Sequence, residues 1–168
     1  MTAEDWMRTG KAWVIPDEYI NTDAMMPHRG YDLPPREQEA LVLATIRPGW
    51  ASLVEEGDIL ITGRGFGVGS SRPAPTMLRR LGIAAVVCES AAEIFFRNCV
   101  SYALPILECP GVLGMVTEGD RVSVDIATGA FANLETGRTA QGEGMPPMLL
   151  ETIAGGGTHA VLEQLGYM

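Results

Sequence analysis

Short apolar runs in the middle of the chain predict buried strands that alternate with helices. Asp58 to Thr62, Ile83 to Cys88 and Leu104 to Glu108 are each rich in apolar residues. Runs of this length are typical of strands that are buried on both faces of a parallel sheet. We expect Thr76 to Leu81 to form a helix between the first two strands, and Gly82 to end it.

A second helix is expected from Ser90 to Tyr102. Ser90 is a residue type that caps helices, and the apolar positions that follow fall on one helical face: Ala91, Ile94, Phe95 and Cys99. Strands and helices that alternate through short connections form parallel βαβ units. The sequence therefore predicts an α/β fold with a parallel core.

The two ends of the chain follow other patterns. Arg121 to Ile126 alternates polar and apolar residues, as a half-exposed strand does, and turn residues after it indicate antiparallel strands. Two prolines open an expected helix from Met148 to Ala154, and Thr158 to Leu165 is expected to form a last one. In the N-terminal third, one strand is expected at Ala12 to Ile15, followed by a long loop punctuated by prolines.

Composition favours one soluble domain over residues 1–168. The chain has 46% hydrophobic residues, a net charge of −9 and a pI of about 4.6, so its average field repels phosphate backbones and anionic lipids. No stretch approaches the roughly 20 apolar residues of a membrane helix. The start MTAEDWMRTGKAW carries acidic residues where a secretory signal needs a basic start. We therefore expect a cytoplasmic protein without nucleic-acid or membrane partners.

The three cysteines are expected to be reduced core residues. Cys88, Cys99 and Cys109 are an odd number, and their spacing fits neither a zinc site nor a two-cysteine redox motif. Each lies in an apolar context, where thiols are commonly buried. The chain alone is therefore not expected to hold a metal or an iron–sulfur cluster.

The segment GRGFGVGSSR, which ends at Arg72, lies where the first buried strand leads into a helix. Glycines there allow a close approach of the backbone to a ligand, and a helix N-terminus favours anions. Ser70 and Ser71 add hydroxyl groups, and Arg72 adds a fork that matches a carboxylate. No lysine follows, as a phosphate-binding P-loop requires, and the glycine spacing does not fit a dinucleotide site. Two interpretations stay open: an anion site, or a glycine-rich turn with a serine helix cap.

Taken with the rest of the chain, this segment resembles the small subunits of 3-isopropylmalate dehydratase and homoaconitase, relatives of the aconitase swivel domain. The resemblance continues in GIAAVVCESAAEIFFRNCVSYALPILECP, in the opening GKAWVIPDEYINTDAMMP, in VEEGDILITG and in the closing MPPMLLETIAGGG. It implies a swivelling β/β/α domain of the aconitase C-terminal type, with a mixed sheet. It also implies a hydro-lyase subunit, active only with a large subunit that carries a 4Fe-4S cluster and binds the substrate hydroxyl.

The resemblance also implies roles for individual residues. Ser70, as its alkoxide, would remove a carbon-bound proton, and Arg72 would grip a substrate carboxylate. Ser71 and Gly69 would contribute to substrate binding. Asp23 matches an acidic residue that lies at the family's site; the alternative for it is an ordinary turn or helix-cap aspartate.

Two segments leave the identity of the substrate open. His28 and Arg29 lie in the loop that discriminates substrates in the relatives, but Gly30-Tyr31-Asp32 follows neither the isopropylmalate nor the homoaconitate pattern. Where the family usually continues with Glu-His-Ala, this chain has Pro73-Ala74-Pro75. Despite these departures, the resemblance implies that the substrate is isopropylmalate, with 3-isopropylmalate and 2-isopropylmalate interconverted in leucine biosynthesis. The alternatives are homoaconitase, a dimethylmalate-type dehydratase, or a carboxylate-binding module without catalysis.

Overall fold

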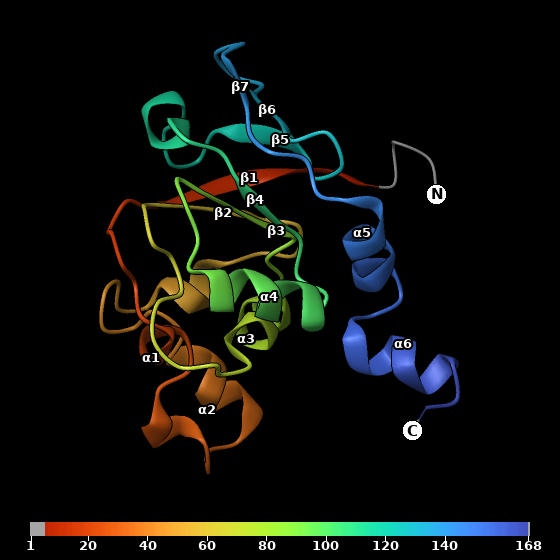
Figure 1. Ribbon diagram of the computed structural model, residues 1–168. Coiled ribbons are helices and arrows are strands. Elements are labelled where there is room, and N and C mark those ends of the chain that lie inside the picture. The colour runs from red at the N-terminus through yellow and green to blue at the C-terminus, as the bar shows by residue number, and fades with distance from the viewer. Residues whose placement is uncertain (1–5, 168) are drawn as a thin grey trace.

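Seven strands form one sheet in the order β4-β3-β2-β1-β5-β6-β7 (Figure 1). The computed structural model describes residues 6–167. Residues 1–5 and 168 lie outside it, so part of the acidic start that disfavours a secretory signal is not described. The strands are β1 (Met7–Ile15), β2 (Ile59–Thr62), β3 (Ala85–Cys88), β4 (Ile106–Glu108), β5 (Arg121–Asp125), β6 (Ala130–Asn133) and β7 (Thr139–Gln141). This arrangement confirms the predicted α/β class with a mixed sheet.

The parallel half consists of β1 to β4 and contains the three strands predicted from apolar runs. Every residue of β2 and β3 is buried, and Leu60 pairs with Val86 in the register between them. Its strands carry apolar side chains on both faces, as strands buried in a parallel sheet do. The prediction of buried parallel strands is therefore confirmed, with β3 and β4 each beginning two residues later than expected.

Strand β1 joins the two halves and is longer than predicted. Its end, Ala12–Ile15, pairs in parallel with β2, whereas its beginning, Met7–Lys11, pairs antiparallel with β5. The beginning has Met7 and Thr9 exposed. The beginning of β1 therefore lacks an apolar run like the one that predicts a strand at Ala12–Ile15.

Helices pack against the parallel half, and the antiparallel strands extend away from them (Figure 1). The α-helices are α1 (Thr22–Met25), α2 (Pro35–Ala40), α3 (Ala74–Leu81), α4 (Glu93–Ser101), α5 (Pro147–Ala154) and α6 (Thr158–Gln164). The expected loop of the N-terminal third contains α1, α2 and two 3-10 helices, η2 (His28–Gly30) and η3 (Trp50–Leu53), and a third, η4 (Val112–Met115), follows β4. No helix within residues 6–167 is long and apolar enough to cross a bilayer.

Two details of α4 differ from the prediction. The residue that caps it is Ala92, so a cap by Ser90 is wrong. The hydroxyl of Ser90 instead accepts a hydrogen bond from the backbone N–H of Gly65, at 3.0 Å, and so supports the glycine-rich turn. Phe95 is fully buried as expected, whereas Ile94 is 38% exposed.

Candidate functional site

The glycine-rich turn leaves the carboxyl end of β2 and passes close to two neighbouring segments. A Cβ atom at Gly67 would lie 2.1 Å from the ring of Phe95 on α4. A Cβ atom at Gly69 would lie 2.5 Å from the side-chain oxygen of Asn21. Both glycines have positive φ angles, +84° and +111°. Glycine is therefore needed at both positions, for space and for conformation.

Ser70 and Arg72 lie side by side at the end of this turn. The Nε–H of Arg72 donates a hydrogen bond to the Oγ of Ser70 at 2.8 Å. Ser70 is exposed, whereas the Arg72 side chain is only 18% exposed. A guanidinium at this distance stabilises negative charge on the serine oxygen. The serine can therefore meet a ligand while its oxygen is held beside a fixed positive charge.

Three further groups hold the guanidinium of Arg72. Its Nη2 forms an ion pair with Asp23 at 2.5 Å, and its Nη1 donates to the backbone oxygen of Met26 at 2.9 Å. The ring of Tyr31 lies 5.7 Å from its Cζ. A guanidinium has five N–H donors, so donors remain for a substrate carboxylate. The structure places Asp23 in an ion pair with Arg72, next to Ser70, and its part in a reaction stays a prediction.

The loop after α1 contributes an aromatic wall beside Arg72. The ring of His28 stacks on that of Tyr31, with centroids 5.0 Å apart and an interplanar angle of 27°. Arg29 is exposed on the same 3-10 turn and, within the described part of the chain, forms no hydrogen bond or ion pair with Ser70 or Arg72. His28 thus lies near the site through Tyr31, whereas Arg29 does not join it.

Two residues that the sequence did not single out form hydrogen bonds with the Ser70–Arg72 turn. The side-chain N–H of Asn98 on α4 donates to the backbone oxygen of Arg72 at 3.2 Å and to the Oγ of Ser71 at 3.4 Å. The hydroxyl of Thr22 on α1 donates to the backbone oxygen of Ser70 at 3.1 Å. Thr22 precedes Asp23 in a quoted motif, but nothing local to the sequence marks Asn98.

The interpretation of Ser70 and Ser71 as helix caps is wrong. Helix α3 is preceded by Pro73 in the capping position, with no hydrogen bond from a capping side chain. Pro75 lies in its first turn and has no N–H, and the N–H of Thr76 bonds to the oxygen of Pro73. The helix end thus has few free donors for an anion, and Arg72 is the donor that reaches Ser70.

The cysteine side chains do not fit the ligation of a metal or cluster. Cys88, Cys99 and Cys109 are buried, as predicted, and free of disulfides. Burial raises the pKa of all three thiols, which disfavours the thiolate that binds metals. Among residues 6–167, no group of three His, Cys, Asp or Glu side chains is placed to hold a metal ion.

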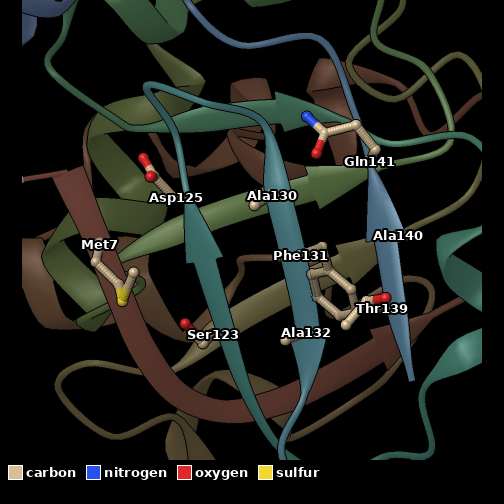
Figure 2. A pocket seen from close by; sticks show the side chains of 9 residues that line it. All are labelled: Met7, Ser123, Asp125, Ala130, Phe131, Ala132, Thr139, Ala140 and Gln141. Atoms are coloured by element: carbon tan, nitrogen blue, oxygen red, sulfur yellow. The ribbon is translucent and has the colours of Figure 1, made fainter. Parts of the chain in front are cut away.

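A separate hollow of about 410 Å³ lies on the antiparallel half of the sheet (Figure 2). Its lining is made largely of small side chains and contains none of the predicted site residues. Asp125, at its edge, accepts hydrogen bonds from Ala127 and Thr128 that close its own turn. The carboxylate of Asp125 is thus used in local structure.

Comparisons with known proteins agree with this architecture. Residues 20–110, which include Asp23, Ser70 and Arg72, match the family described as the aconitase C-terminal domain. A crystal structure of 3-isopropylmalate dehydratase from Methanocaldococcus jannaschii matches with a TM-score of 0.86 at 27% identity, and the match covers 96% of each chain.

Curated relatives are similar over most of the chain. The chain is 36% identical to the isopropylmalate/citramalate isomerase small subunit of Methanocaldococcus jannaschii, over 92% of this chain and 93% of that one. It is 40% identical to the 3-isopropylmalate dehydratase small subunit of Thermodesulfovibrio yellowstonii, over 88% and 89% of the two chains. It is 36% identical to the 2,3-dimethylmalate dehydratase small subunit of Eubacterium barkeri, over 82% and 86%.

Proposed function

The chain belongs to the aconitase C-terminal domain family, among its dehydratase small subunits, and we propose that it is the small subunit of a two-chain hydro-lyase that acts on a substituted malate. The expected family, fold type and hydro-lyase class are confirmed by these relatives. Their names as small subunits indicate a larger partner chain. The substrate that we propose is 3-isopropylmalate, interconverted with 2-isopropylmalate.

One observation carries the proposed chemistry: the 2.8 Å hydrogen bond from Arg72 to the Oγ of Ser70. A serine hydroxyl is too weakly acidic to act as a base unless its oxyanion is stabilised. With Arg72 beside it, the Ser70 alkoxide would take a proton from a substrate carbon and become a hydroxyl, while the electron pair forms the double bond. The neighbouring carbon–oxygen bond breaks, and hydroxide leaves.

Carboxylate binding is the second role that we propose for this turn. The remaining N–H groups of Arg72 would grip one substrate carboxylate, with the Ser71 hydroxyl and the backbone at Gly69 beside it. Asp23 would keep the guanidinium oriented through their ion pair at 2.5 Å. His28 and Arg29, both exposed on η2, would lie at the edge of the bound substrate.

Departure of the hydroxide requires a Lewis acid, and a 4Fe-4S cluster on the large subunit would supply it when bound. The residues of this chain do not fit its ligation, because the three thiols are buried with raised pKa values. This chain would therefore contribute the base and the group that binds the carboxylate.

We propose a cytoplasmic complex that serves leucine biosynthesis.

A second substrate is favoured by one specific observation. A relative at 36% identity is named a 2,3-dimethylmalate dehydratase small subunit, and this chain has Pro73-Ala74-Pro75 where the family usually has Glu-His-Ala. A dimethylmalate-type substrate is therefore the second candidate, ahead of homoaconitate. A carboxylate-binding module without catalysis is disfavoured, because the serine–arginine pair is in contact.

Ser70→Ala in the complex with a co-expressed large subunit tests the proposal. The base is lost, so we expect turnover of both isopropylmalates and of 2,3-dimethylmalate to fall to background. Assembly should be unchanged by gel filtration. Ser52→Ala is the matched control, because Ser52 is an exposed serine on η3 that bonds the oxygen of Gly49. Turnover retained in Ser70→Ala would remove this residue from the proposed role.

A further inference from the structure

We propose that Asn98 and Thr22 are positioning residues that clamp the Ser70–Arg72 turn, so that the guanidinium stays against the serine oxygen. The catalytic consequence of this clamp rests on the proposed function, whereas its geometric consequence can be measured on the chain alone. Neither residue contacts the reacting oxygen directly. Each binds a backbone oxygen at one end of the turn.

Asn98 fixes the Arg72 end of the turn. It is half-buried on α4, and the same helix inserts Phe95 and Cys99, both fully buried, into the core. Its Nδ2 reaches the backbone oxygen of Arg72 at 3.2 Å and the hydroxyl of Ser71 at 3.4 Å. The core holds α4 in place, and these hydrogen bonds therefore hold the turn in a fixed position relative to α4.

Thr22 fixes the Ser70 end of the turn. The residue is fully buried, and its backbone N–H bonds the oxygen of Val68 at 2.9 Å. Its hydroxyl bonds the oxygen of Ser70 at 3.1 Å. The same hydroxyl lies 3.5 Å from the side-chain oxygen of Asn21, so the oxygen of Ser70 is the nearer of its two acceptors, and a buried hydroxyl without an acceptor is costly.

The turn needs such support because its own residues provide little. Ser70 and Ser71 are exposed, and Gly69 before them has a φ of +111°, which gives the chain a flexible entry. Within the turn, the N–H of Arg72 bonds the oxygen of Ser70 at 2.8 Å. Hydrogen bonds to both backbone oxygens restrict how far the Nε of Arg72 and the Oγ of Ser70 can move apart.

The first test is made on the isolated chain by NMR of the arginine Nε–H groups, with the Arg72 signal identified by its loss in Arg72→Lys. In the wild type we expect this proton to exchange slowly with water. In Asn98→Ala and in Thr22→Val, which keeps the shape of threonine without the hydroxyl, we expect a shifted and faster-exchanging signal. Thr22→Ser restores the hydroxyl and should restore the signal. Arg97→Ala, an exposed neighbour on α4 that pairs with Glu93, should leave it unchanged.

The second test is turnover of isopropylmalate by the complex with the large subunit. We expect kcat to fall on the order of tenfold to a hundredfold in Asn98→Ala and Thr22→Val, because small misplacements of catalytic groups have effects of this size. KM should change much less. The weaker stabilisation of the Ser70 oxyanion should also move the rise of kcat to higher pH, which a mere loss of folded protein would not do.

The outcomes separate the clamp from the proposed function. An Arg72 signal that is unchanged in both Asn98→Ala and Thr22→Val, with circular dichroism confirming that they fold, overturns the clamp. If one variant fails to fold, the other still decides. A wild-type complex that turns over none of the substituted malates contradicts the proposed function, while the NMR result stands on its own.

Discussion

The guanidinium of Arg72 has partners in its own turn and in a second segment, residues 23–31, that lies about forty residues earlier in the sequence. It donates to Ser70 in its own turn, pairs with Asp23 on α1 and bonds the oxygen of Met26 after that helix, while Tyr31 lies over it. These contacts use all three nitrogens of the planar guanidinium: Nε, Nη1 and Nη2. An ammonium group is a point charge that cannot reproduce them together.

Arg72→Lys should therefore impair the reaction although the charge is kept. Loss of the donor at Ser70 removes the stabilisation of its oxyanion, and removal of one such donor typically lowers kcat by about 100- to 1,000-fold. Stability should change by less than about 1 kcal/mol, because the Asp23 side chain is 59% exposed and its ion pair is screened by solvent. Steady-state kinetics of the complex and urea unfolding of the chain measure the two effects. A kcat near that of the wild type would show that the fork is not needed.

Not every residue of the site could be predicted from the sequence. Ser70, Arg72 and Asp23 were identified through motifs, and the structure brings them into contact. Asn98 was missed because its contact depends on how α4 packs beside the turn, which is not local information. Ser90 was assigned to a helix cap, but its hydroxyl supports Gly65 instead. A serine suits both roles, and the tertiary fold decides between them.

At the scale of elements, burial explains which ones were predictable. Strands β2 and β3 are buried at every position, so their apolar composition marks them. Helices α1 and α2 could not be predicted from the sequence, because they are four and six residues long and lie among prolines. Helix α2 buries none of its residues, so it has no apolar face to recognise.

The contact between the glycine-rich turn and α4 should be intolerant of any side chain. In Gly67→Ala the new methyl group would meet the ring of Phe95 and the backbone would keep an unfavourable positive φ, so we expect a loss of about 2–4 kcal/mol in the free energy of unfolding. Gly111→Ala is the matched control. Gly111 has a φ of +90° but no atom within 4 Å of its virtual Cβ, so only the conformational cost of about 1 kcal/mol should appear. Equal losses in urea titrations would show that Phe95 does not restrict the turn.

At the scale of the whole molecule, β1 is shared by both halves of the sheet. It pairs with β2 on one side and with β5 on the other, so neither half is complete without it. An ion pair adds a second link: Arg47, in the segment before η3, holds Glu118, in the turn before β5, with Nη2 to Oε1 at 2.7 Å. Parallel and antiparallel halves are therefore expected to depend on each other.

Unfolding should accordingly occur in one transition over the whole chain. Tryptophan fluorescence, which reports on the buried Trp13 of β1 and on Trp50 and Trp6, and far-ultraviolet circular dichroism should give coincident urea curves. This measurement also tests the expectation of a single domain over residues 1–168. Two separated transitions would show that the halves fold independently.

The link between Arg47 and Glu118 should make stability depend on pH. The hydrogen bond from Arg47 lowers the pKa of Glu118 below its ordinary value of 4.5, although burial opposes this in part. A carboxylate with a lowered pKa contributes stability above 4.5, and this contribution is lost as the pH falls through the folded-state pKa. We expect Glu118→Gln to lose up to about 1 kcal/mol at pH 7, since both side chains are partly exposed. The difference from the wild type should shrink in acid, and a constant difference in urea titrations would contradict this origin.

The central place of β1 has a consequence for biosynthesis. Among the strands of this sheet the ribosome makes β1 before the others, but Ala12 pairs with Ile59 and Met7 pairs with Asp125. Until most of the polypeptide has emerged, the nascent β1 carries unpaired edges on both sides, the kind of segment that aggregates or recruits chaperones. Completion of the sheet must therefore wait until β5 has been made, and β1 needs protection along its length until then.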